Sequence, residues 1–218
     1  MTLERLIYSV PAILIAMVLH ELSHAWVSYR LGDPTPKQTG RLTLNPLKHL
    51  DPLGSLLLLF AGFGWAKPVQ INPYYYKNRK MGTVLVSLAG PCMNFILALI
   101  GSLIISIIYR IVGERITFET EAGYKAFIYV WRFLYYFMML NIGLGVFNLI
   151  PFPPLDGSKV LASVLPDPLY SKWMRYERYG QFVLILVLYL GLLNTPLSFL
   201  RSQVFNGFRI FTDWIVGV

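Results

Sequence analysis

Two histidines and a glutamate near the N-terminus have the types and the spacing of a metal-dependent hydrolase. Residues 20–24 read HELSH, which is an HExxH motif. Residues four apart lie on one face of a helix, so His20 and His24 can offer two imidazoles to one Zn²⁺ ion. Glu21 is adjacent to the first of them and can act as general base toward a water molecule at the metal. The alternative is a chance motif with core histidines, but the chain has only 3 histidines and two of them lie here.

A catalytic zinc site normally has three protein ligands, so a third is expected elsewhere. Four further residues are candidates: His49, Asp51, Cys92 and Asp156. His49 and Asp51 lie on a long polar loop that would have to fold back, and Cys92 is expected to be a small core residue of an apolar helix. Asp156 follows three prolines that break a helix and expose backbone polar groups. A carboxylate there is well suited to be the third ligand, although it could instead cap a helix starting at Ser158.

The composition indicates that these groups belong to a membrane protein. The 218 residues are 56% hydrophobic and only 14% charged, with a mean hydropathy of +0.55. Soluble domains carry about 25% charged residues, which excludes an ordinary soluble enzyme as well as a disordered chain. The single cysteine excludes a disulfide framework and a multi-thiolate metal site. The net charge of +8 fits an anionic membrane surface, and no nucleic-acid partner is expected.

Four apolar windows are candidates for membrane-crossing helices. Residues 6–29 contain the HExxH motif and can cross only if its polar groups face inward. Because HELSHAW follows in place of a small-residue cleavage site, a cleaved signal peptide is not expected. Residues 81–109, 133–155 and 179–200 each reach the roughly 20 residues that a spanning helix needs. The glycine-rich stretch 53–66 is shorter and is expected to be re-entrant or interfacial.

Two shorter patterns accompany the windows. Residues 65–71, WAKPVQI, alternate weakly and predict a short strand or hairpin, which Pro68 would confine to a sheet edge. The tail after Arg201 predicts an amphipathic helix that lies at the interface or packs on the bundle. Its apolar face would carry Val204, Phe208, Phe211 and Ile215.

These elements predict an all-α polytopic membrane protein. We expect a helical bundle of about four to six membrane segments, with a short re-entrant or β-hairpin element and a helix broken at the active site. The chain is expected to form one domain over residues 1–218. Its catalytic core would cover about 1–157 and its C-terminal helices about 158–218.

The basic residues predict the orientation. Residues 30–80 hold eight Lys or Arg against two Asp, whereas residues 110–125 hold three basic and three acidic residues. The positive-inside rule therefore places the first stretch in the cytoplasm and the second outside. The HExxH motif and Asp156 then come to the same depth, near the cytoplasmic ends of two helices. We expect a multi-pass protein of the plasma or inner membrane with its active site toward the cytoplasmic side.

At these motifs the sequence resembles the site-2 proteases, a family of zinc intramembrane metallopeptidases. The resemblance rests on HELSH at 20–24, on N-x-x-P-x-x-x-L-D-G at 148–157 and on G-P-x-x-N at 90–94. The loop at 45–54 and the segment GWAKPV at 64–69 look like those of bacterial members. The resemblance extends from the first helix to the end of the second motif, and the family's PDZ and CBS domains have no room here. The expectation is a minimal bacterial-type member without accessory domains.

The resemblance implies a set of roles for individual residues. His20, His24 and Asp156 would bind one zinc ion per chain. Glu21 would activate the water molecule as the catalytic base. Asn148 would be a nearby donor that steadies the oxyanion.

The resemblance also implies an activity, an endopeptidase that cuts a peptide bond within or near a transmembrane segment. Its partners would be single-span membrane proteins in the lipid bilayer, whose helix must first unwind. A hairpin around residues 65–73 could pair with the unwound strand. Two other functions compete: a membrane zinc hydrolase acting on a lipid or small molecule, and a non-catalytic zinc-binding membrane protein. The presence of Glu21 argues against the second.

Overall fold

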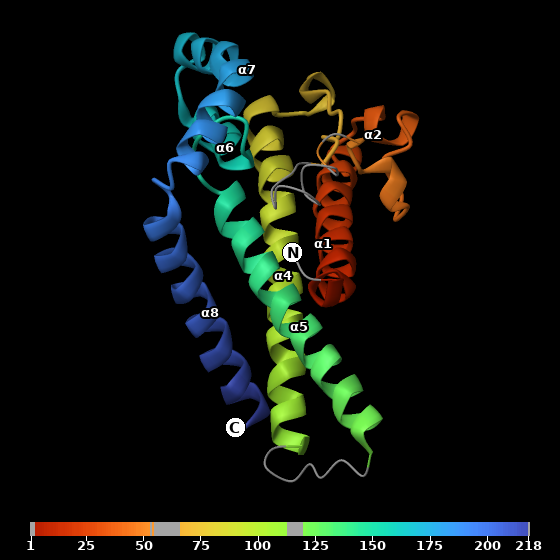
Figure 1. Ribbon diagram of the computed structural model, residues 1–218. Helices are drawn as coiled ribbons and strands as arrows, with labels where there is room; N and C mark the ends of the chain where they lie inside the picture. The colour runs from red at the N-terminus through yellow and green to blue at the C-terminus, as the bar shows by residue number, and fades with distance from the viewer. Residues whose placement is uncertain (1–2, 53, 55–65, 113–119, 218) are drawn as a thin grey trace. The chain divides into compact units, whose positions relative to one another are not determined.

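The computed structural model describes residues 3–52, 54, 66–112 and 120–217 (Figure 1). Within these ranges every regular element is a helix and no strand forms, which confirms the predicted all-α class. The α-helices are α1 Leu3–Arg30, α2 Thr35–Gln38, α4 Arg79–Val112, α5 Glu121–Asn148, α6 Asp156–Val164, α7 Asp167–Tyr189 and α8 Asn194–Val216. Two short 3₁₀ helices join them, η1 Pro46–Lys48 and η2 Pro73–Tyr75.

Among the described helices, three are long and apolar enough to cross a membrane. They are Leu6–Arg30 of α1, Arg79–Ile111 of α4 and Glu121–Asn148 of α5. A fourth crossing arises if Tyr179–Tyr189 of α7 and Asn194–Val216 of α8 form one broken span. The predicted polytopic membrane class is therefore confirmed.

The window at 179–200 is not the continuous helix that its hydropathy predicts. Helix α7 ends at Tyr189 and α8 begins at Asn194. Gly191 lies between them with a φ of 69°, a left-handed conformation that glycine adopts without steric cost. The N–H of Leu192 donates to Val187 O at 3.2 Å, so the turn satisfies the last carbonyls of α7 as a glycine C-terminal cap does.

The third window also differs from its predicted limits. Helix α5 begins at Glu121, well before residue 133, and ends at Asn148, because the prolines that follow cannot continue a helix. Near WAKPVQI, the described residues form one isolated antiparallel bridge, between Leu50 and Ala66, and no regular strand. The re-entrant stretch predicted at 53–66 lies outside the described residues, apart from Gly54 and Ala66.

The described chain divides into two compact units. The first contains Met1–Ala16, Asn94–Val146 and Thr195–Val218, and the second contains Met17–Met93 and Phe147–Asn194. The single domain expected over residues 1–218 stays a prediction.

The first unit is built around an apolar cluster to which the C-terminal helix contributes. Four buried residues of α4 and α5 form its centre: Ala98, Met138, Ile142 and Val146. Val204 and Phe208 of α8 pack against this cluster, as one of the two interpretations of the amphipathic tail predicted. Phe211 and Ile215, which the pattern placed on the same face, are about half exposed.

Polar contacts also join the helices of the first unit. The side-chain amide of Asn94 donates to Asn141 Oδ1 at 2.9 Å, and both side chains are fully buried. Ser102 Oγ lies 2.9 Å from Thr212 Oγ1, which links α4 to α8. The buried polar side chains of these two pairs satisfy one another, which an apolar environment favours.

Candidate metal centre

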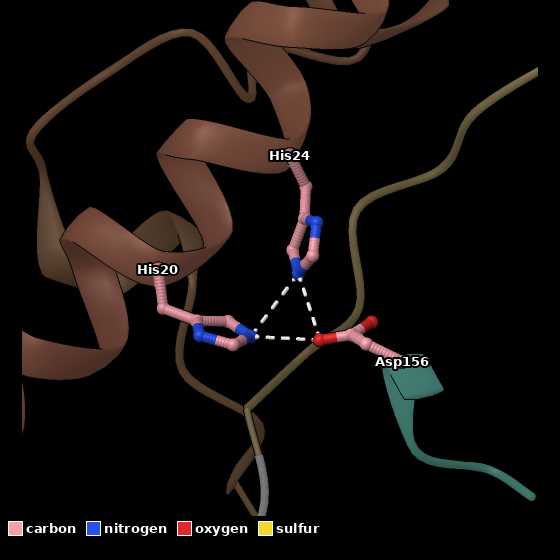
Figure 2. A group of neighbouring side chains, drawn as sticks. All are labelled: His20, His24 and Asp156. Atoms are coloured by element: carbon pink, nitrogen blue, oxygen red, sulfur yellow. Dashed lines mark hydrogen bonds and ion pairs between the residues drawn. The ribbon is translucent and has the colours of Figure 1, made fainter. Parts of the chain in front are cut away.

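In the second unit, helix α1 brings two imidazoles together and α6 adds a carboxylate. The Nε2 atoms of His20 and His24 lie 3.1 Å apart. Asp156 Oδ2 lies 3.3 Å from His20 Nε2 and 3.2 Å from His24 Nε2 (Figure 2). Within the described part of the chain, these three residues form the one group of histidine, cysteine and acidic side chains whose ligand atoms could hold a metal ion.

The proline run explains how Asp156 reaches the histidines. Helix α5 ends at Asn148, the chain continues irregularly through the prolines, and α6 begins at Asp156. The cap residue of α6 is Leu155, in an extended conformation with ψ of 155° and no side-chain cap hydrogen bond. The carboxylate of Asp156 therefore does not cap a helix starting at Ser158, and it points to the imidazoles instead.

Gly157 fixes the approach of α6. A Cβ atom at this position would lie 2.5 Å from the carbonyl carbon of Leu149 and 2.7 Å from Ile150 O. Both neighbours are backbone atoms, which have little freedom to move away. Any side chain at Gly157 would therefore shift the residue before it, Asp156.

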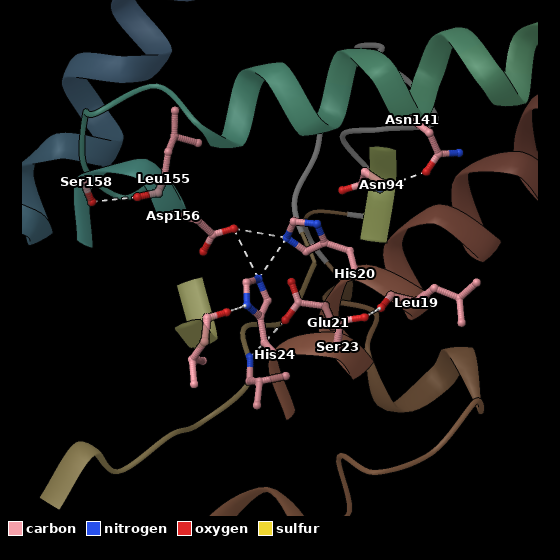
Figure 3. Close-up of polar contacts among 12 residues, drawn as sticks. Leu19, His20, Glu21, Ser23, His24, Asn94, Asn141, Leu155, Asp156 and Ser158 are labelled. Carbon is pink, nitrogen blue, oxygen red and sulfur yellow. Dashed lines mark hydrogen bonds and ion pairs between the residues drawn. The ribbon is translucent and has the colours of Figure 1, made fainter. Parts of the chain in front are cut away.

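Helix α4 orients His24 through a backbone carbonyl group. His24 Nδ1 lies 2.6 Å from the backbone carbonyl oxygen of Val86 (Figure 3). A proton on Nδ1 donates to this carbonyl, which leaves the lone pair of Nε2 free toward His20 and Asp156. Ligand histidines are typically held in this way, with the second nitrogen bonded to a carbonyl or carboxylate.

A glycine of α4 allows the backbone to come this close. A Cβ at Gly90 would lie 2.5 Å from His20 Cε1 and 2.6 Å from His20 Nε2, and it would be closer still to His24 Nε2. Only a residue without a side chain fits there. The α4 backbone thus forms one wall of the site.

The catalytic base proposed from the sequence lies beside this group. The Glu21 carboxylate is half-buried, and its Oε2 accepts a hydrogen bond from the backbone N–H of Val69 at 3.1 Å. Glu21 is not a member of the candidate metal group. A hydrogen bond from a distant part of the chain therefore restrains the Glu21 side chain, which is not one of the three candidate ligands.

The donor set fits a catalytic zinc ion. Two imidazole nitrogens and one carboxylate oxygen are ligands that zinc accepts, and three protein ligands leave a position open. Atoms bound tetrahedrally at about 2.0–2.1 Å from zinc lie roughly 3.3 Å apart, close to the 3.1, 3.2 and 3.3 Å between these donors. Both histidines are buried, with 8% of each exposed. Calcium and magnesium prefer all-oxygen sites, which this is not.

The other candidate ligands lie elsewhere. His49 is fully buried, and its Nε2 is 2.8 Å from Thr43 O. Asp51 accepts a hydrogen bond from the N–H of Gly54 at 2.8 Å. Cys92 is exposed, which corrects its expected place in the core. Of the four candidates for third ligand, the structure therefore brings only Asp156 to the histidines.

Asn148 is the last residue of α5 and is half-buried, in the same unit as the histidines. Its role as oxyanion donor stays a prediction. The contacts that the sequence did not predict are made by backbone atoms, the carbonyl of Val86 and the N–H of Val69. Neither has a sequence signature, because every residue except proline carries both groups.

Comparison with known proteins agrees with these features. The sequence matches Peptidase family M50 over residues 8–190. It is 41% identical to "Putative zinc metalloprotease YwhC" of Bacillus subtilis, over 88% of this chain and 82% of that protein. It is 28% identical to "Putative zinc metalloprotease Rip2" of Mycolicibacterium smegmatis, over 83% of this chain and 66% of that protein. No solved structure gives a significant match. The chain belongs to peptidase family M50, the site-2 protease family, and is a membrane-spanning zinc metalloprotease.

Proposed function

We propose that this metalloprotease is an intramembrane endopeptidase, which hydrolyses a peptide bond within or near the transmembrane segment of a substrate protein. One observation carries the proposal. The donor atoms of His20, His24 and Asp156 converge at 3.1–3.3 Å, and both histidines lie within Leu6–Arg30, a stretch apolar enough to cross a membrane. A hydrolytic site on such a helix acts where water is scarce and transmembrane substrates are at hand.

The three converging side chains would hold one zinc ion per chain. When bound, zinc would supply a Lewis acid that polarises the scissile carbonyl and lowers the pKa of a water molecule toward ~7. Glu21 takes the proton from the attacking water and returns it to the leaving nitrogen. The Val69 N–H keeps the Glu21 carboxylate oriented for both transfers. Asn148 donates a hydrogen bond to the developing oxyanion.

The proposed substrates are single-span membrane proteins in the lipid bilayer. A transmembrane helix satisfies its own backbone hydrogen bonds, so it must unwind before cleavage. Residues 67–72 form an extended segment next to Glu21, and within the described chain no hydrogen bond is made by the backbone of Gln70. An unwound substrate strand would pair with these open groups, which offsets part of the unwinding free energy.

The proposed location is the plasma or inner membrane, with the site toward the cytoplasm. The support is the charge pattern, eight basic and two acidic residues over 30–80. Exposed aromatic side chains lie with basic ones in this region: the Arg79 guanidinium lies 4.2 Å from the centre of the Tyr74 ring, and Tyr74 is 75% exposed. Aromatic and basic residues together are typical of a membrane interface.

A paired assay tests the proposed function. The purified protein in detergent is given a single-span membrane peptide in one reaction and a lipid extract in another. We expect peptide cleavage that a chelator abolishes and added zinc restores, with no lipid hydrolysis. Zinc-dependent turnover of lipid with an intact peptide would contradict the proposal and favour the competing hydrolase.

A further inference from the structure

The segment at residues 67–72 lies outside any sheet. Within the described chain its bonds to other backbone groups are at its two ends, from Lys67 N–H to His49 O at 2.8 Å and from Tyr75 N–H to Asn72 O at 3.2 Å. Its Val69 N–H bonds the Glu21 carboxylate, so the place of this segment sets the place of the base. In the described chain, one isolated bridge at Ala66 is the only β-type pairing near it. In addition to these backbone bonds, two buried charged side chains hold the segment, one at each end.

Arg41 holds the first end. Its Nη2 donates to Pro68 O at 2.8 Å and to Lys67 O at 3.2 Å, while its Nη1 donates to Lys48 O. The guanidinium thus spans two segments of the chain, using the fixed fork of donors that lysine lacks. Arg41 is 4% exposed, and among the described residues its only side-chain partners are these three carbonyls. Burying a cation is unfavourable unless it is hydrogen-bonded, and these three carbonyls offset part of that cost.

Asp33 holds the other end. Its Oδ2 accepts the backbone N–H of Asn72 at 2.7 Å and the hydroxyl of Ser28 at 2.8 Å. Its Oδ1 accepts the N–H of Thr35 at 2.9 Å. The Tyr76 hydroxyl lies 2.8 Å from Ser28 Oγ and donates to it, because the Ser28 proton is already directed to Asp33.

The Asp33 side chain is fully buried. Burial raises the pKa of Asp33, but its hydrogen bonds outweigh that effect and leave the pKa below its ordinary value. Ser28 lies four residues after His24 on α1, on the same helical face. Asp33 therefore ties the end of the substrate-facing segment to the helix that carries both histidines.

We propose that Arg41 and Asp33 are positioning residues, which clamp the two ends of residues 67–72 so that the Val69 N–H can orient the Glu21 carboxylate. The inference rests on the proposed function, in which Glu21 is the base. Neither residue is a member of the candidate metal group. Loosening either clamp leaves the metal-ligand atoms of His20, His24 and Asp156 in place but lets residues 67–72 move. Misplacing a catalytic group by about 1 Å can reduce the rate by ~10²-fold.

The test uses the full-length protein in detergent and three measurements on each sample: zinc content, cleavage of a single-span peptide, and amide hydrogen exchange. The variants are Arg41→Gln, Arg41→Lys and Asp33→Asn. The control is Lys48→Gln, which removes a positive charge from the same loop at an exposed side chain. Exchange over residues 67–72 is compared with exchange over 20–28 of α1.

For Arg41→Gln and Asp33→Asn we expect full zinc content, kcat reduced by about 10- to 100-fold, and exchange over 67–72 at least ~10-fold faster while α1 is unchanged. Arg41→Lys keeps the charge without the fork, so its kcat should lie between those of Arg41→Gln and the wild type. Lys48→Gln should match the wild type in all three measurements.

Unchanged exchange over 67–72 in both loosened variants would overturn the inference. Loss of zinc together with activity would also overturn it, since the residues would then support the whole unit. If Arg41→Gln does not fold, Asp33→Asn decides, and failure of both to fold counts against a positioning role. A wild-type protein that binds zinc but cleaves no peptide would refute the proposed function. The exchange rates over residues 67–72 would still show whether Arg41 and Asp33 hold this segment in place.

Discussion

Replacing Gly90 with alanine would press a methyl group directly against both imidazoles of the candidate metal centre. The new Cβ would lie 2.5 Å from His20 Cε1 and 2.6 Å from His20 Nε2, and closer to His24 Nε2. Comfortable contacts between such atoms begin at about 3.5 Å, so the imidazoles or α4 must move by roughly 1 Å. Zinc sites tolerate ligand displacements of only about 0.2 Å. The substitution should therefore disrupt the site although it replaces none of the proposed ligands.

The expected magnitude is large for function and modest for stability. We expect Gly90→Ala to weaken zinc binding by at least ~10–100-fold, the range seen when groups that orient ligands are lost, with peptide cleavage falling in parallel. Overpacking costs about 1–3 kcal/mol, and the change from glycine to alanine inside a helix returns about 1 kcal/mol. The protein should therefore still fold, so loss of zinc cannot be attributed to a melted helix.

The assay is zinc content on purified protein, with peptide cleavage measured on the same sample. Gly207→Ala is the matched control, since Gly207 lies within α8 and a Cβ there would meet nothing within 4 Å. We expect this control to keep its zinc and its turnover. Full zinc content and normal turnover in Gly90→Ala would refute the close approach of α4 to the imidazoles.

Three further predictions concern the ligands and the topology. Asp156→Ala should lose zinc and activity, whereas Cys92→Ser should keep both; stoichiometric zinc in folded Asp156→Ala would contradict the ligand assignment. Gly157→Ala should weaken zinc binding by roughly 10-fold, because its Cβ would lie 2.5 Å from the Leu149 carbonyl carbon and push Asp156 aside. Zinc affinity is measured by competition with a chelator, and an unchanged affinity would refute this prediction. In a Cys92→Ser background, Thr120→Cys should react with an impermeant probe on intact cells, and reaction only after permeabilisation would show the inverted orientation.

Much of the candidate site could be predicted from the sequence because its donors follow simple geometric rules. His20 and His24 are four residues apart, and a helix places them on one face. Asp156 follows prolines that must end a helix, and a carboxylate at this break was the expected third ligand. The pattern of charge then placed both motifs at one depth.

The parts that the sequence did not predict have physical reasons. Residues 179–200 are uncharged throughout, so hydropathy carries no trace of the turn between α7 and α8. The local signals were Gly191, a residue type that commonly ends helices, and Asn194 with Pro196, residue types that commonly begin them. The partners of His24 and Glu21 are backbone atoms of Val86 and Val69, which only the folded chain brings into place.

The sequence likewise did not predict the hydrogen-bonding partners of the segment WAKPVQI. Its alternation predicted a strand, yet in the described residues its carbonyls and N–H groups are bonded largely by side chains. Arg41 bonds the carbonyls of Lys67 and Pro68, and Glu21 bonds the N–H of Val69. The Lys67 N–H bonds a backbone oxygen, that of His49. A weak alternation of apolar and polar residues indicates an extended backbone, but it does not identify the groups to which that backbone is hydrogen-bonded.

The central claim is that Glu21 is the catalytic base of a zinc peptidase, and Glu21→Gln tests it most directly. Glutamine keeps the size of the side chain and an oxygen that can accept the Val69 N–H, which now bonds Glu21 at 3.1 Å, but it cannot take up a proton. The measurement is cleavage of a single-span peptide by purified protein, with zinc determined on the same sample. We expect zinc content equal to that of the wild type and a rate reduced by at least ~10²–10⁴-fold, the usual effect of a positioned acid–base group. Near-normal cleavage by the zinc-loaded variant would contradict the claim and remove Glu21 from the mechanism.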